Sequence, residues 1–155
     1  MPAPFNDLRL NPFRSDRRQF SGCVATATGI KYGMVVIGDT ATTNARDVRL
    51  PAGANATLTR GVVSDHGDPN AAGALVDSFA VGDEFACCVG GDVEVLLDAG
   101  ATATKDTAAC TAATVGTVKN DTGTGDVVGY FNMTYDNSAG ALPVLVSMRM
   151  GKQVR

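Results

Sequence analysis

The chain has no tryptophan and one histidine, and several classes of function depend on these residues. A metal site built on two imidazoles is excluded, because His66 has no second histidine to join it. The segment from Asp65 to Asn70 is also rich in Gly, Pro, Asp and Asn, so it predicts a loop and a poor support for a catalytic triad. We therefore expect neither a histidine metal centre nor triad chemistry.

The patterns that carry other chemistry are missing as well. No G-x-S-x-G and no G-x-x-x-x-G-K-S/T occurs, and the segment from Gly123 to Val128 lacks the third glycine of G-x-G-x-x-G. The carboxylate pairs Asp83 with Glu84 and Asp92 with Glu94 stand beside turn glycines, where acidic residues are ordinary. We therefore expect a protein that is not an enzyme and has no metal and no cofactor.

The four cysteines form no C-x-x-C pair, so their spacing matches no zinc pattern. Adjacent Cys87 and Cys88 point to opposite faces if they lie in a strand. In a reducing cytosol we expect all four to be free thiols that act as small hydrophobic residues. A disulfide such as Cys23–Cys110 stays open as an alternative if the protein ends in an oxidising medium.

Long apolar runs are absent, and charge is unevenly placed. No signal peptide and no run of 18 apolar residues occurs, so we expect synthesis in the cytosol without export and no membrane partner. Residues 1–20 carry a net +2 and residues 149–155 a net +3, whereas the segment between them has six basic and fourteen acidic residues. An acidic body disfavours binding to nucleic acid, because it repels the phosphates. The basic ends can dock on an acidic protein surface, or they simply keep the ends of the chain soluble.

Short runs of Val, Ile, Leu and Ala separated by Gly, Asp and Asn fill the chain from about residue 33 to residue 148. They predict roughly ten strands, hence an all-β fold: a jelly-roll-like sandwich or a small closed β-barrel with an extended N-terminal arm. The continuous run Met34–Ile37 predicts a strand buried on both faces. The predicted strands are Gly22–Thr28, Met34–Ile37, Asp47–Leu50, Ala56–Val63, Leu75–Phe79, Glu84–Val89, Val93–Leu97, Thr114–Val118, Val127–Tyr135 and Leu142–Met150.

Three local patterns make sharper predictions. Gly90-Gly91-Asp92 between two apolar runs predicts a hairpin turn. Leu75–Phe79 is expected to pair with Glu84–Val89, and the Ala- and Thr-rich segment Ala101–Ala113 predicts a loop with at most one short strand.

Residues 1–20 form a candidate arm, and residues 21–155 a single β domain. The arm contains Pro2, Pro4 and Pro12, and its apolar residues follow neither the helical nor the strand period. This is typical of an extended segment that orders on a partner, with Phe and Leu as anchors and Arg as hydrogen-bond donor. The alternative is that the arm packs over its own barrel as a cap.

Several segments together resemble the capsid cement, or head decoration, proteins of tailed bacteriophages. The segments are Lys31–Asp39, Leu58–Val63, Phe79–Glu84, Gly91–Asp106, Val115–Val118, Gly129–Phe131 and Ala141–Met148. The resemblance covers residues 22–150 and consists of glycine and aliphatic positions. Two features depart from the family: the segment Thr104 to Asp106 has no glycine where the family has one before Asp, and the arm is longer.

The resemblance implies a β-barrel or jelly-roll body bound outside the major capsid shell, on the virion exterior, after assembly in the host cytoplasm. It implies dimers or trimers at local symmetry axes that tie neighbouring capsomers together. The partners are then the major capsid protein and the protein itself. The expected shell contacts are the arm residues Phe5, Leu8, Leu10, Phe13, Arg14, Arg17, Arg18 and Phe20, and in the tail Arg149 and Arg155.

Two other functions remain open at this point. A trimeric all-β nucleotide hydrolase is also small and Gly-rich, although its nucleotide motifs are not visible here. A carbohydrate-binding or fibre module usually presents Trp or Tyr, and this chain has three Tyr residues.

Overall fold

The computed structural model describes residues 19–65 and 78–153, and these contain eleven strands and no helix. The all-β prediction is therefore confirmed, and within the described ranges no helix is long and apolar enough to cross a membrane. The strands are β1 (Gln19–Ala25), β2 (Val35–Gly38), β3 (Asp47–Arg49), β4 (Thr59–Val63), β5 (Glu84–Leu97), β6 (Thr102–Ala103), β7 (Ala108–Thr111), β8 (Val118–Asn120), β9 (Val127–Phe131), β10 (Tyr135–Asp136) and β11 (Val144–Gln153).

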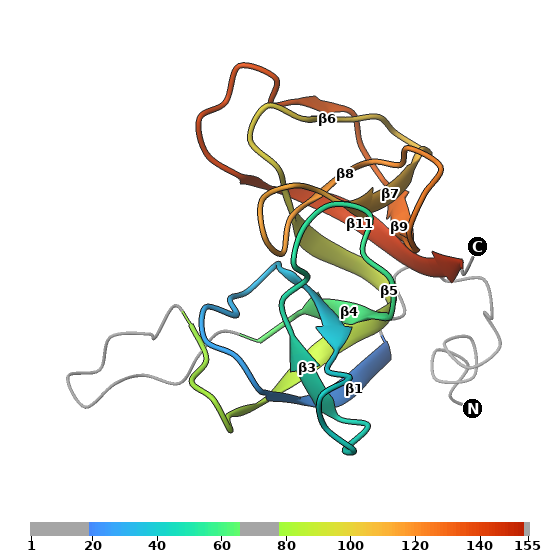
Figure 1. Cartoon of the computed structure of the whole chain (residues 1–155). Helices are drawn as coiled ribbons and strands as arrows, with labels where there is room; N and C mark the ends of the chain where they lie inside the picture. Colours follow the sequence, from blue (N-terminus) through green and yellow to red (C-terminus); the bar gives the residue numbers. More distant parts are fainter. Residues whose placement is uncertain (1–18, 66–77, 154–155) are drawn as a thin grey trace, which may run out of the picture.

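Nine of the strands form one sheet that closes on itself twice. Its order is β1-β3-β2-β4-β5-β11-β9-β7-β8, and β5 also pairs with β1 at one end and with β8 at the other. The first barrel thus contains β1 to β5, and the second contains β5, β7, β8, β9 and β11 (Figure 1). The prediction of a small closed barrel is confirmed by these two closures. Closure removes the exposed strand edges that an open sheet would have.

Strand β5 is the element that the two barrels share. Its first half pairs with β1 and β4, and its second half, from Gly91 to Leu97, pairs with β11. The predicted hairpin at Gly90-Gly91-Asp92 is therefore wrong: the strand continues through these residues. Gly91 has a φ of 82°, which lets the strand bend from one barrel into the other instead of reversing.

Each barrel has its own core, and adjacent residues alternate between the two cores. Val36 and Val63 lie in the first core, while their neighbours Val35 and Val62 lie in the second. Cys87 and Cys88 divide in the same way, so the prediction that they face opposite sides is confirmed. The run Met34–Ile37 is apolar because β2 is buried on both faces, as its sequence predicts.

Several predicted boundaries differ from the structure. Strand β1 begins at Gln19, so Phe20, which we assigned to the arm, lies in a strand. Phe79 pairs with Ile30 and not with β5. Residues 66–77, including His66, lie outside the described residues.

Differences also occur in the second barrel. The segment Ala101–Ala113 holds two strands, because β6 pairs with distant β10 and β7 pairs with both β8 and β9. The predicted strand Thr114–Val118 is mostly a turn, in which the Thr117 N–H donates to the Thr114 carbonyl. The predicted strand Val127–Tyr135 ends at Phe131 and continues, after a turn, as β10.

The loop before β4 joins the two barrels. The Asn55 N–H donates to the Thr111 carbonyl, and a Cβ on Gly125 would lie only 2.4 Å from the Asn55 oxygen. Buried Asp126 accepts hydrogen bonds from the N–H and the hydroxyl of buried Thr59, both at 3.1 Å. These contacts fix the second barrel on the first.

Candidate interaction site

The bend in β5 is where the chain enters and leaves the double barrel. Gln19, the first residue of β1, pairs with Gly90, and Met150 of β11 pairs with Gly91. In Figure 1 the start of β1 and the end of β11 lie on the same side of the molecule, next to β5. We call this region, with Gln19, Phe20, Asp92, Arg149 and Met150, the junction surface.

The structure places only two of the predicted contact residues. Phe20 lies on β1, pairs with Cys88, and is 56% exposed. Arg149 lies in β11 and not in a tail, which corrects its assignment. Phe5, Leu8, Leu10, Phe13, Arg14, Arg17, Arg18 and Arg155 lie outside the described residues.

Arg149 belongs to a polar row on the outer face of β5, β11 and β9. Its Nε atom lies 3.7 Å from the Asp92 Oδ1 atom, and the same oxygen accepts a hydrogen bond from the Asn132 amide at 3.1 Å. The Asn132 amide also donates to the Ser147 hydroxyl at 3.0 Å. The ion pair is half-exposed and of little value for stability, so the guanidinium keeps donors for an external acceptor.

A cavity of about 100 Å³ lies next to the junction surface, between the barrels. Its apolar walls come from Val89, Val128 and Met150. Arg60 also lines the cavity, and its guanidinium forms no ion pair with any of the described residues. It has room for a small aliphatic side chain beside an oxygen acceptor. Sequence analysis missed this cavity, because its residues come from β4, β5, β9 and β11 and share no motif.

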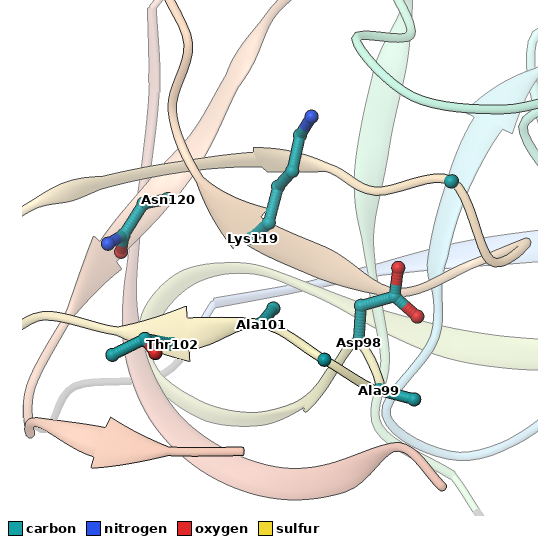
Figure 2. A pocket seen from close by; sticks show the side chains of 8 residues that line it. Asp98, Ala99, Ala101, Thr102, Lys119 and Asn120 are labelled. Carbon is teal, nitrogen blue, oxygen red and sulfur yellow. The ribbon is translucent and has the colours of Figure 1, made fainter. Parts of the chain in front are cut away.

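A larger cavity of about 360 Å³ lies at the far end of the second barrel (Figure 2). Small residues such as Ala99, Ala101 and Ala113 leave the space open, and Lys119 and Asn120 supply polar groups. Asp98 borders it with the Oδ1 atom buried and unpaired, while Oδ2 accepts a long, weak bond of 3.4 Å from the Thr114 N–H. Because Oδ1 is enclosed by protein atoms, this oxygen does not face the cavity.

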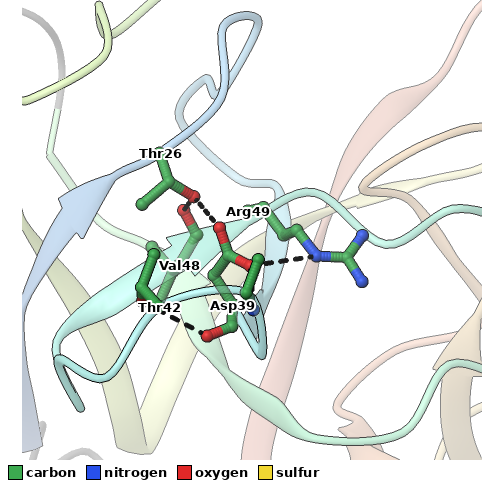
Figure 3. A network of polar contacts seen from close by, with 6 residues as sticks. Thr26, Asp39, Thr42, Val48 and Arg49 are labelled. Carbon is green, nitrogen blue, oxygen red and sulfur yellow. Dashed lines mark hydrogen bonds and ion pairs between the residues drawn. The ribbon is translucent and has the colours of Figure 1, made fainter.

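A polar network holds the opposite end of the first barrel together (Figure 3). The Thr26 hydroxyl donates to Asp39 at 2.6 Å and lies 3.1 Å from the Val48 carbonyl, and Arg49 lies 3.8 Å from the same carboxylate. The hydrogen bond from Thr26, followed by that from the Ala41 N–H, lowers the pKa of Asp39 below its usual value. The network joins the ends of β1, β2 and β3, so its role is structural.

Possible metal ligands do not cluster among the described residues. In the part of the chain that the structure describes, no three His, Cys, Asp or Glu side chains are close enough to hold a metal ion. Among the described residues, the junction surface combines an exposed aromatic ring with an exposed guanidinium.

Comparisons with known proteins bear on the fold. No family model and no curated protein matches the sequence. Among solved structures, the chain is similar to the N base of the head fibre protein gp8.5 of bacteriophage phi29, with a TM-score of 0.51 and 14% identity. The match covers 87% of this chain and 95% of that chain, so the two share a fold over nearly their whole lengths.

Proposed function

We propose that this protein is a structural component of a bacteriophage virion, a capsid cement protein that binds the outside of the major capsid shell and bridges neighbouring capsomers. The observation that carries the proposal is the fold shared with the base of a phage head fibre, over 95% of that chain. The sequence resemblance to head decoration proteins points to the same class. The proposed role is mechanical, with no catalytic step.

The double barrel supports this role because its first and last strands, β1 and β11, both meet β5 at the junction surface. Phe20 and Arg149 are exposed there. An exposed aromatic ring and an exposed guanidinium are both groups that suit a protein interface. The basic ends are complementary to an acidic shell, whereas the acidic body is not attracted to packaged nucleic acid.

Bridging explains how such a small body stabilises a shell. Once one contact forms, the second becomes intramolecular and gains from effective concentration. A protein that binds only the expanded shell shifts the equilibrium toward it by mass action. Dimers or trimers at local symmetry axes, formed in the host cytoplasm before or during docking, multiply this effect.

The test is co-sedimentation of the purified protein with expanded empty shells, alongside light scattering of the protein alone. We expect saturable binding that raises the temperature at which the shells break down. Removing residues 1–18 is expected to lower shell affinity at least about 100-fold while the body keeps its melting temperature, because the deletion leaves β1 intact.

A matched control separates the arm from general charge. Lys105→Ala removes a positive charge on an exposed turn of the second barrel that is not part of the junction surface, and is expected to leave binding unchanged. Full binding by the truncated protein would rule out the arm as the docking element. Failure of the intact protein to bind any expanded shell would rule out the cement role.

A fibre module that binds carbohydrate is the second candidate, and one arrangement favours it. Tyr130 pairs with Arg149 on the outer face of β9 and β11, and the Tyr32 hydroxyl donates to Glu94 on neighbouring β5 at 2.8 Å. The tyrosines thus flank the polar row that contains Asp92 and Asn132. Saturable glycan binding in solution, lost in Tyr130→Ala, would favour this candidate over cement.

A further inference from the structure

Two cysteines from distant parts of the sequence meet in the first barrel. Strands β1 and β5 close this barrel, with Cys23 opposite Phe85 and Ser21 opposite Cys87. Cys23 and Cys87 are therefore diagonal neighbours on one face of the strand pair, and their thiols lie close enough to share a hydrogen bond. Both side chains are buried in the first core, at 4% and 0% exposure.

The two thiols differ in acidity because they share a hydrogen bond. The bond lowers the pKa of the Cys23 thiol, and the positive charges of Arg46 and Arg60 act in the same direction, against the effect of burial. The same bond, with burial, raises the pKa of the Cys87 thiol. Cys23 is thus the better nucleophile of the pair, and Cys87 holds the proton.

The other two cysteines are separate from this pair. Cys88 points into the second core, with its sulfur 3.1 Å from the Gly90 carbonyl oxygen. Cys110 lies on β7 in the second barrel, with its sulfur 3.4 Å from the Asn55 Oδ1 atom. The fold therefore offers Cys23 the thiol of Cys87 and not that of Cys110, the partner considered from sequence.

We propose that Cys23 and Cys87 are a redox-sensitive pair that a peroxide closes into a disulfide across the β1–β5 contact. The Cys23 thiolate attacks one oxygen of hydrogen peroxide, which leaves a sulfenic acid on Cys23 and releases hydroxide. The Cys87 sulfur then attacks the Cys23 sulfur, forming the S–S bond and expelling the sulfenic oxygen as water. Overall, two thiols are oxidised, one peroxide is reduced, and two waters form.

The disulfide would link β1 to β5 at the point where the first barrel closes. Residues 23 and 87 enclose a long loop, so the cross-link removes much conformational freedom from the unfolded chain. It also fixes the strand from which residues 1–18 extend. If the proposed virion function is right, the pair is reduced during assembly in the cytoplasm and closes after release; the chemistry itself does not depend on that function.

The experiment compares reduced full-length protein before and after treatment with hydrogen peroxide. We expect a loss of two hydrogen atoms by mass spectrometry and a peptide that joins Cys23 to Cys87 in a non-reducing digest. The melting temperature is expected to rise by about 10 °C and to return on reduction with dithiothreitol. Cys87→Ser is expected to lose the shift, and Cys88→Ser, whose thiol lies in the other core, is expected to keep it.

The peptide map of the wild-type protein decides the matter even if a variant folds poorly. Retention of four free thiols under conditions that oxidise the urea-unfolded protein would overturn the proposal. A linkage to Cys88 or Cys110, or stepwise addition of oxygen to Cys23 without a link to Cys87, would overturn it as well. Absence of shell binding would not affect the result, so this test and the test of function fail independently.

Discussion

At the residue scale, polar side chains stabilise the fold most where they join strands that are distant in the sequence. Asp39 accepts hydrogen bonds from Thr26 and the Ala41 N–H and lies near Arg49, so one carboxylate holds the ends of three strands (Figure 3). All of these partners favour the ionised form. Stability of the first barrel should therefore depend on the charge of Asp39.

This dependence predicts a loss of stability in acid. Because the folded pKa of Asp39 is lower than the unfolded value, its contribution is present above about pH 4 and is lost as the pH falls through the folded pKa. The melting temperature of Asp39→Asn should accordingly fall less steeply than that of wild type between about pH 4.5 and pH 2.5.

A second variant changes Thr26, the hydrogen-bond donor, instead of Asp39, the acceptor. Thr26→Val removes the largest cause of the lowered pKa, so the folded pKa moves toward the unfolded value and the melting temperature of this variant should also fall less steeply in acid than that of wild type. Asp136, whose pKa is lowered mainly by the Ser138 hydroxyl, contributes in the same direction and remains in both variants. Parallel curves for wild type and Asp39→Asn would contradict the prediction.

At the element scale, the central feature is a strand that serves two barrels. Strand β5 has 14 residues, and its partners change from β1 and β4 to β11 at Gly90 and Gly91. A bend is needed because one straight strand cannot follow the walls of both barrels. The positive φ of Gly91 provides it at no steric cost.

Replacing this glycine should weaken the whole protein. Gly91→Ala is expected to lower the free energy of unfolding by about 1–2 kcal/mol, because a side chain disfavours a φ of 82°. Urea denaturation measures the change. Gly53→Ala is the matched control, since no atom lies within 4 Å of its added Cβ and its backbone is not left-handed, so no loss is expected there. Equal stabilities of wild type and Gly91→Ala would show that the bend does not depend on glycine.

At the scale of the whole molecule, the two barrels act as one body because polar contacts join them as well as β5. Thr59 of β4 and Asp126, just before β9, are both buried and bonded to each other through two donors of Thr59. The Asp126 N–H in turn donates to the Ala56 carbonyl at 3.0 Å. A rigid body of this kind would suit the proposed role, since it could transmit force between contacts at different points of a shell.

A double-mutant cycle tests this connection. Asp126→Ala should cost about 2–3 kcal/mol of unfolding free energy, because it leaves buried donors of Thr59 without their acceptor. For the double mutant with Thr59→Ala, we expect a coupling energy of about 1–2 kcal/mol between the two sites. For wild type, we expect a single unfolding transition. Additive effects, or separate melting of the two barrels, would show that the contact does not join them.

The sequence alone was enough for the fold class and for much of the strand pattern. The run Met34–Ile37 indicated burial on both faces, and the adjacent pair Cys87 and Cys88 indicated opposite faces, because strand geometry is local and has a period of two. The missing reaction motifs likewise directed attention to contact surfaces. What the arm residues bind remains a prediction.

Only the tertiary structure decided how the strands are joined. Gly90-Gly91-Asp92 has the composition of a hairpin turn, yet pairing with β1 and β11, more than 50 residues away on either side, makes β5 continue through it with a bend instead of reversing. The same long-range pairing brings Cys23 to Cys87 and places Phe20 and Arg149 at one junction. Sequence patterns reveal which face of a strand is apolar, but the choice of partner depends on the combined burial of many strands, which no local pattern contains.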